Sequence, residues 1–428
     1  NERIEISSLP GSYSSSGFSN DSKSLFYITD INNEFSYLNE YDIESNESSV
    51  VYKTEWDVMY SYLSKNEKYR IIGVNEDGKN SVKAIEVDSN LPIKLPSFNN
   101  ADITSVSFSE SEQKIRLSVG SSKMPNNLFV YDIEDETLKK ITNSLNPEID
   151  SNSLVNAEVV RYKSFDGLEI PAIYYKPLNA SKKNKVPALI WVHGGPGGQS
   201  RIGFNPLIQY LTNNGYAILA VNNRGSSGYG KSFYKMDDRN HGEKDLKDCV
   251  WGKKWLQRQE YIDENKIGII GGSYGGYMTM AAMTFTPNEF KVGVNIFGVT
   301  NWIRTLKSIP IFWEASRKAL YDELGDPFTI DSVRLKKISP LFHADKVKNP
   351  VLVLQGANDP RVLQIESDEI VEELNKNNIP VEYIVFDDEG HGFRKKDNQI
   401  EGYRKIKNFL DLYLKSPKYI EEKNKRLD

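Results

Sequence analysis

The chain has 428 residues, enough for two or three domains of ordinary size. Hydrophobic residues make up 39% and charged residues 26% of the sequence, a balance that excludes a disordered chain. The net charge is −5 and no Lys/Arg-rich block occurs, so nucleic acid is not an expected partner. No apolar run approaches the ~18 residues of a membrane helix, and no membrane association is expected either.

The cysteine content bears on the compartment. Cys249 is the only cysteine and cannot form an internal disulfide, which fits a reducing environment, and we expect a cytoplasmic protein. Some exported proteins also lack disulfides, so an exported form stays open. The sequence begins at Asn1 without a charged-then-apolar leader, and we expect it to be processed or cut from a longer chain.

The composition changes near residue 150, where we place a domain boundary (1–150 and 151–428). Residues 1–150 contain 26 Ser and 5 Gly, whereas residues 151–428 contain 15 Ser and 24 Gly. The first part repeats an aromatic residue followed by a polar turn, and the copies start 44 and 46 residues apart, at Phe18, Tyr62 and Phe108. A period near 45 with several short strands per unit predicts propeller blades, with a generic β-sandwich as the alternative.

The number of repeats limits the architecture of residues 1–150. Three blades do not close a ring, because propellers use about 4–8. We therefore predict an incomplete β-propeller of about three blades, completed by preceding residues or by a second chain. Its unpaired strand edges can also accept a partner strand, which leaves a homo-oligomer open.

Residues 151–428 alternate strands with helices. The expected strands are mostly continuous apolar runs, as in a sheet buried on both faces, at 170–175, 188–192, 217–221, 267–270, 292–296, 351–355 and 381–386. Between them apolar residues recur at helical spacing, for example at Ile370, Val371 and Leu374. The pattern predicts a doubly wound, mostly parallel α/β sheet with its site at the carboxyl ends of the strands.

A G-x-S-x-G pattern at residues 271–275 carries the strongest chemical signal. It follows an apolar strand that ends at Ile270 and precedes a helix-like run that begins at Tyr277. This strand–turn–helix context is that of a nucleophile elbow, in which the Ser273 hydroxyl projects above the sheet. Glycines two residues to either side let the backbones pass without Cβ clashes. The alternative is a Gly-rich loop without a chemical role.

A serine hydroxyl needs a base to take its proton. Of the four histidines, His391 alone lies beyond the last predicted strand, in the Gly-flanked loop where the elbow fold places its base. His343 is interpreted as a packed or surface residue. His241 is interpreted as a structural or capping residue that opens a helix.

The third member of the set must orient the imidazole and stabilise its cation. Asp359 follows the 351–355 strand and gives the chain order Ser, Asp, His that the elbow fold requires. Its rivals Asp387, Asp388 and Glu389 lie close to the histidine in sequence, and they are interpreted as exposed loop charges.

An oxyanion hole needs two N–H donors. We assign one to the backbone of Tyr274, the residue after the nucleophile, and the other to Gly195 in the glycine-rich loop 193–198. His193 has no further ligand-type residues at metal-binding spacing and is interpreted as holding this loop in place. No metal and no organic cofactor are expected for the reaction.

Taken in order, these segments resemble the catalytic domain of the prolyl oligopeptidase family, and most closely its acylaminoacyl-peptidase branch. The matching stretches lie within about residues 157–413, at 193–196, 222–230, 271–277, 358–362 and 388–393. The resemblance implies an α/β-hydrolase fold capped by a β-propeller that restricts the site to short peptides. It also implies Ser273, Asp359 and His391 as the triad, which the residues indicate independently.

The resemblance implies two further sets of substrate contacts. Arg361 matches a family arginine that hydrogen-bonds a substrate carbonyl, with a surface ion pair as the alternative. Val362, Trp302 and Trp313 could line the pocket for the side chain before the cut bond, with plain core packing as the alternative. No paired-Glu motif of the dipeptidyl-peptidase kind is recognised, and the loop at 193–196 favours a backbone oxyanion donor.

We therefore predict a serine peptidase that cleaves short peptides through an acyl-enzyme. The alternatives are a carboxylesterase-type hydrolase on the same triad and a propeller-bearing binding protein with an inactive hydrolase domain. Side-chain preference and the choice between free and blocked amino termini are not readable from the sequence.

Overall fold

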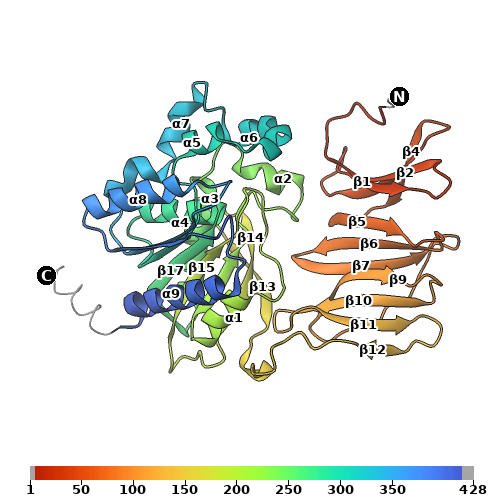
Figure 1. Cartoon of the computed structure of the whole chain (residues 1–428), viewed down its shortest axis with the longest axis horizontal. Coiled ribbons are helices and arrows are strands. Elements are labelled where there is room, and N and C mark those ends of the chain that lie inside the picture. Colours follow the sequence, from red (N-terminus) through yellow and green to blue (C-terminus); the bar gives the residue numbers. More distant parts are fainter. Residues whose placement is uncertain (1–4, 417–428) are drawn as a thin grey trace. The chain divides into compact units, whose positions relative to one another are not determined.

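A computed structural model describes residues 5–416 (Figure 1). Two compact units are present. The first comprises the chain up to Asn156 together with two later segments, Arg201–Asn205 and Ser227–Tyr234. The second comprises Ala157–Ser200, Pro206–Ser226 and the chain from Lys235 onward. Within residues 5–416, no helix combines the length and the apolar character that crossing a membrane requires.

The first unit contains three four-stranded antiparallel sheets, each formed by consecutive strands. The first sheet contains β1 (Tyr13–Phe18), β2 (Ser24–Thr29), β3 (Tyr37–Asp42) and β4 (Glu47–Tyr52). The second contains β5 (Asp57–Leu63), β6 (Tyr69–Glu76), β7 (Lys79–Glu86) and β8 (Leu91–Pro92). The third contains β9 (Asp102–Phe108), β10 (Lys114–Gly120), β11 (Asn127–Asp132) and β12 (Leu138–Lys140). These sheets confirm the three predicted blades.

The middle sheet shows how the blades pack. Side chains alternate between the two faces of a strand. On β6, Ile72 and Val74 join a core with the first sheet, whereas Ile71 joins a core with the third. All three are fully buried. A strand that is apolar on both faces is therefore required in a blade that lies between two others.

The repeated polar turns connect the first and second strands of each sheet. Ser22, Glu67 and Glu112 occupy equivalent positions in these turns and share a left-handed backbone, with φ between 57° and 60°. Successive turns also hydrogen-bond to one another, since the N–H of Asn66 donates to Glu112 Oε1 at 2.7 Å. The spacing seen in the sequence thus reflects one turn geometry repeated in each blade.

The second unit contains one eight-stranded sheet in the order β13-β14-β16-β15-β17-β18-β19-β20. Its strands are β13 (Ala157–Lys163), β14 (Glu169–Tyr175), β15 (Val186–Val192), β16 (Ala217–Val221), β17 (Ile262–Gly272), β18 (Gly293–Ile296), β19 (Val351–Gly356) and β20 (Val381–Phe386). The pairs β13–β14 and β14–β16 are antiparallel and all later pairs are parallel. The predicted α/β-hydrolase sheet is confirmed.

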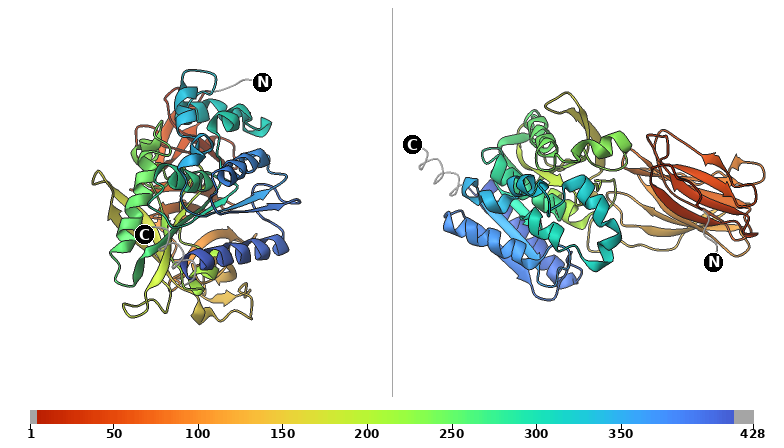
Figure 2. Two further views of the ribbon diagram at one scale, coloured as in Figure 1. Left: turned by 90° about the vertical axis from the view of Figure 1, so that its left-hand side faces the viewer. Right: turned by 90° about the horizontal axis from the view of Figure 1, so that it is seen from above.

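Helices cover both faces of this sheet (Figure 2). On one face α1 (Pro206–Asn213) contacts α9 (Lys396–Leu414). On the other lie α3 (Lys244–Gln257), α4 (Tyr274–Phe285) and α8 (Gln364–Lys376). Because both faces are covered, β16 and β19 are buried along their whole length, as their apolar sequences predict.

Several elements were not predicted from the sequence. The edge strand β13 combines exposed and half-buried residues with the buried Tyr162 rather than forming an apolar run. Between β18 and β19 lie three short helices, α5 (Trp302–Lys307), α6 (Arg317–Leu324) and α7 (Asp331–Lys337). The four-residue α2 (Lys231–Tyr234) belongs to the first unit.

Candidate active site

Ser273 stands in a strained turn between β17 and α4. Its φ and ψ are 57° and −120°, a backbone conformation that costs a non-glycine residue about 1–3 kcal/mol. The flanking glycines are required sterically: a Cβ on Gly271 would lie 2.4 Å from the backbone of Gly275. A Cβ on Gly275 would lie 2.1 Å from the carbonyl oxygen of Val192. This geometry is the predicted nucleophile elbow.

The imidazole of His391 lies between the other two predicted residues. Its Nε2 is 2.9 Å from Ser273 Oγ, and its Nδ1 is 2.6 Å from Asp359 Oδ2. The structure therefore brings together three side chains that stand 86 and 32 residues apart in the sequence. The His391 ring also packs against Phe297, with ring centroids 4.7 Å apart.

The carboxylate of Asp359 is held from its other side by the backbone. Its Oδ1 accepts the N–H groups of Arg361 at 2.8 Å and of Val362 at 2.9 Å. The side chain is fully buried. The loop that carries it is joined to the His391 loop, because Asn358 N donates to Glu389 O at 2.9 Å. One oxygen is thus left to orient the imidazole.

Two of the three rival carboxylates take other partners, and the third, Asp387, is exposed. Asp388 forms an exposed ion pair with Lys395. Glu389 was predicted to be an exposed loop charge, and this was wrong: it is only 4% exposed. Its carboxylate accepts the N–H groups of Arg394 and Lys395, which lead into α9. A buried glutamate therefore fixes the turn that follows His391.

The glycine-rich loop 193–198 lies beside the nucleophile. A Cβ built on Gly194 would stand 3.5 Å from Ser273 Cβ. The buried His193 ring holds the loop, with Nδ1 2.8 Å from Gly194 O and Nε2 2.8 Å from Ser226 Oγ. Burial lowers the pKa of His193, which favours a neutral ring. Gly195 has φ +146°, and a Cβ there would meet the following amides.

Tyr274 begins α4, so its backbone N–H has no acceptor within the helix and is available to a ligand. Its side chain is buried, and its hydroxyl donates to the fully buried Asp245. Burial raises the pKa of Asp245 to about 6. This contact anchors the residue whose amide is the predicted oxyanion donor.

The predicted substrate-binding residues separate into two groups. Arg361 is exposed, and its guanidinium lies 5.2 Å from the ring centroid of the half-buried Trp313. Val362 and Trp302 are both 3% exposed. Trp302 packs edge-on against Tyr277 at 4.9 Å. Arg361 and Trp313 are therefore accessible to a ligand, whereas Val362 and Trp302 have the environment of core residues.

Comparison with known proteins supplies the family. The model of the prolyl oligopeptidase family matches residues 203–417, half of the chain. The chain belongs to this family. The prediction made from the five motifs is confirmed.

Relatives of two named kinds match. Dipeptidyl aminopeptidase BIII of Pseudoxanthomonas mexicana is 35% identical over 312 residues, which cover 71% of this chain and 45% of that protein. The acylamino-acid-releasing enzyme of Arabidopsis thaliana is 30% identical over 252 residues, 58% of this chain and 33% of that protein. The chain therefore spans less than half the length of these relatives.

A solved structure supports the fold. The puromycin-hydrolyzing peptidase of Mycobacterium tuberculosis superposes with a TM-score of 0.82 at 23% identity. The match covers 92% of this chain and 60% of that chain. The combination of propeller blades and an α/β-hydrolase sheet is therefore a known arrangement.

Two residues with specific contacts in this unit were not predicted. Phe297, which packs on the His391 ring, has φ +42° directly after β18. Glu366 lies in the first turn of α8 and is buried, and it accepts the N–H groups of Thr300 and Asn301. Burial raises the pKa of Glu366. Neither residue lies in a motif or at a spacing that would have indicated its role from the sequence.

Proposed function

We propose that this chain contains the catalytic part of a serine peptidase that hydrolyses short peptides. The observation that carries the proposal is the hydrogen-bonded series from Ser273 through His391 to Asp359. In this geometry Nε2 can accept the serine proton, while Nδ1–H donates to a carboxylate that favours the imidazolium.

The reaction follows from this arrangement. As Ser273 Oγ attacks the peptide carbonyl carbon, its proton passes to His391 Nε2. The imidazolium then gives that proton to the leaving amine, and the carbonyl carbon stays bound to Oγ as an ester. Water enters, His391 takes its proton, and the acid product leaves with Ser273 restored.

The negative charge that develops on the carbonyl oxygen needs preorganised donors. The N–H of Tyr274 is our first donor, and the loop at Gly194 and Gly195 supplies the second. One such donor contributes about 3–4 kcal/mol to catalysis in comparable sites. Arg361, exposed beside Trp313, is our candidate for binding a substrate carbonyl.

The substrate class rests on the relatives. The matched enzymes are named for releasing dipeptides or acylated amino acids. Both names describe cleavage near the amino terminus of a peptide, and we extend that class to this chain. The cytoplasmic location and the absence of a nucleic-acid partner stay predictions, and homo-oligomer formation stays open.

A peptide-library digest analysed by mass spectrometry tests the proposal. Each peptide is supplied with a free and with an N-acetylated amino terminus, and matched acyl esters are assayed in parallel. We expect amide cleavage close to the amino terminus, lost in Ser273→Ala while the thermal unfolding transition is kept. Efficient ester turnover without amide cleavage would instead favour a carboxylesterase. The absence of both activities would favour a binding protein.

A further inference from the structure

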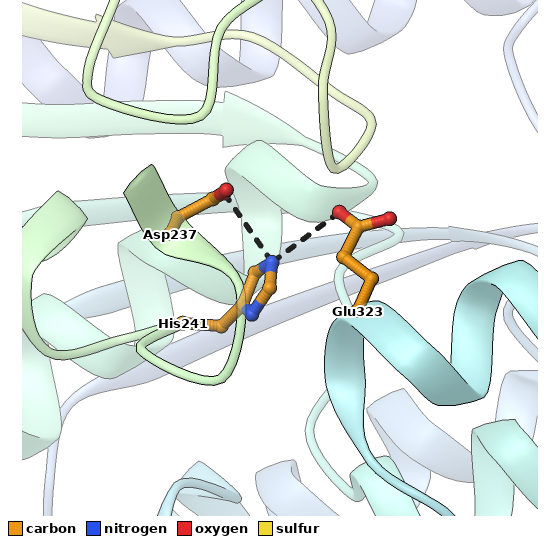
Figure 3. Close-up of side chains that lie close together, drawn as sticks. All are labelled: Asp237, His241 and Glu323. Carbon is orange, nitrogen blue, oxygen red and sulfur yellow. Dashed lines mark ion pairs between the residues drawn. The ribbon is translucent and has the colours of Figure 1, made fainter. Parts of the chain in front are cut away.

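A buried histidine outside the proposed catalytic residues faces two carboxylates (Figure 3). His241 Nε2 lies 3.3 Å from Asp237 Oδ2 and 3.5 Å from Glu323 Oε1. The His241 side chain is fully buried, and within residues 5–416 neither ring nitrogen has a hydrogen-bond partner. The sequence interpretation of His241 as a residue that opens a helix was wrong, because α3 begins only at Lys244.

The spacing of these atoms differs from that of ordinary charged hydrogen bonds. Such bonds between nitrogen and carboxylate oxygen measure about 2.7–2.9 Å. Ligand atoms bound tetrahedrally at about 2.0–2.1 Å from a zinc ion stand about 3.3–3.4 Å apart. The three candidate atoms lie within 4.8 Å of one another, and the two N···O distances match the tetrahedral edge.

The charge around the ring also favours a cation. The carboxylates of Asp237, Glu323 and Asp245 all act on His241. Asp238, the residue after Asp237, adds a further carboxylate to this segment. Placing several carboxylates in a poorly hydrated region costs free energy unless positive charge offsets it. A divalent ion offsets two charges, whereas a proton on the ring offsets one.

The two ligand-bearing segments are held at a fixed separation. Arg239 N donates to Glu323 O at 2.9 Å, and the Arg239 guanidinium donates to the carbonyl oxygens of Tyr321 and Asp322. The segment before α3 is thereby joined to the end of α6. The Glu323 side chain is 18% exposed, so an ion can enter from that side without unfolding the site.

We propose that Asp237, His241 and Glu323 bind one divalent cation of the Zn²⁺ type, with a solvent molecule as the fourth ligand. One imidazole and two carboxylates form a donor set suited to such an ion. The site is structural, since it connects α6 to the segment before α3 and contacts no reacting atom. It adjoins the active site through Tyr274, whose ring lies edge-on to His241 at 5.7 Å.

Metal binding to the full chain tests this proposal directly. The chain is first treated with a chelator and then titrated with Zn²⁺ by calorimetry, and with Co²⁺ by visible spectroscopy. We expect one ion per chain, a tetrahedral Co²⁺ spectrum, and a higher unfolding temperature with Zn²⁺. Glu323→Gln should weaken binding about tenfold or more, because it removes a charged ligand from the partly exposed side.

A matched variant separates this site from surface binding. Asp322→Asn changes the neighbouring carboxylate on α6, which pairs with Lys318, and should leave metal affinity unchanged. Asp237→Asn tests the second ligand, provided that its circular dichroism matches that of the unchanged chain. Absence of one-to-one binding, or equal affinity in Glu323→Gln and the unchanged chain, would overturn the proposal. The ring would then hold a proton between the carboxylates.

Discussion

Replacing Asp359 with Asn separates the chemical role of the carboxylate from its structural one. The two backbone N–H groups from Arg361 and Val362 require an acceptor at the Oδ1 position. They therefore fix the amide oxygen of the new side chain there and place its NH₂ group against His391 Nδ1. Because an NH₂ group donates, Nδ1 must become the acceptor and Nε2 must carry the hydrogen. His391 Nε2, which lies 2.9 Å from Ser273 Oγ, can then no longer accept the serine proton.

We expect kcat on a peptide amide to fall by about 10³–10⁴ in Asp359→Asn, as for the wrong tautomer in other serine hydrolases. The backbone hydrogen bonds are kept, so the unfolding temperature should change little. Asp388→Asn, which alters the exposed contacts of this side chain with Lys395 and Asn398, is the control and should keep its activity. Steady-state kinetics on one amide substrate measures both. A fall of less than tenfold in Asp359→Asn would refute the assignment of the orienting carboxylate.

Three further substitutions test other parts of the site. Gly275→Ala places a Cβ 2.1 Å from Val192 O and should lower the free energy of unfolding by about 1–3 kcal/mol in urea titrations; unchanged stability would contradict the close backbone contact. Arg361→Ala should raise KM for peptides more than it lowers kcat, and unaltered kinetics would leave Arg361 as a surface residue beside Trp313. Burial raises the pKa of Glu366 above 4.5, so the folded chain holds this proton more tightly than the unfolded chain. The stabilisation that comes from this tighter proton binding is complete below pH 4.5 and is lost as the pH rises through the pKa that Glu366 has in the folded chain. The unfolding free energy relative to Glu366→Gln should therefore fall over that pH range. If the difference in unfolding free energy between the unchanged chain and Glu366→Gln does not vary with pH, the raised pKa of the buried Glu366 is contradicted.

The sheet and the chain order of the three catalytic residues could be predicted from the sequence because both depend on local patterns. Strands such as β16 and β19 are apolar throughout, since helices cover both faces. The elbow is readable because Gly271 and Gly275 are sterically required. The position of His391 beyond the last strand then follows from the order of the fold.

The features that the sequence did not indicate depend on contacts between distant segments. Glu389 is buried because the N–H groups of Arg394 and Lys395 offset its charge, and nothing in its spacing distinguishes it from the exposed Asp388. The pairing of His241 with Glu323 joins two segments far apart in the chain. Only the packing of α6 brings them together, so no local motif predicts it.

Labelling with a fluorophosphonate, followed by peptide mapping, tests the central claim most directly. The reagent reacts with a serine only where a neighbouring base takes its proton. We predict a single adduct on the peptide that contains Ser273, formed slowly in Asp359→Asn and absent in Ser273→Ala. An adduct on a different serine, or a rate that does not change in Asp359→Asn, would contradict the proposed hydrogen-bonded series.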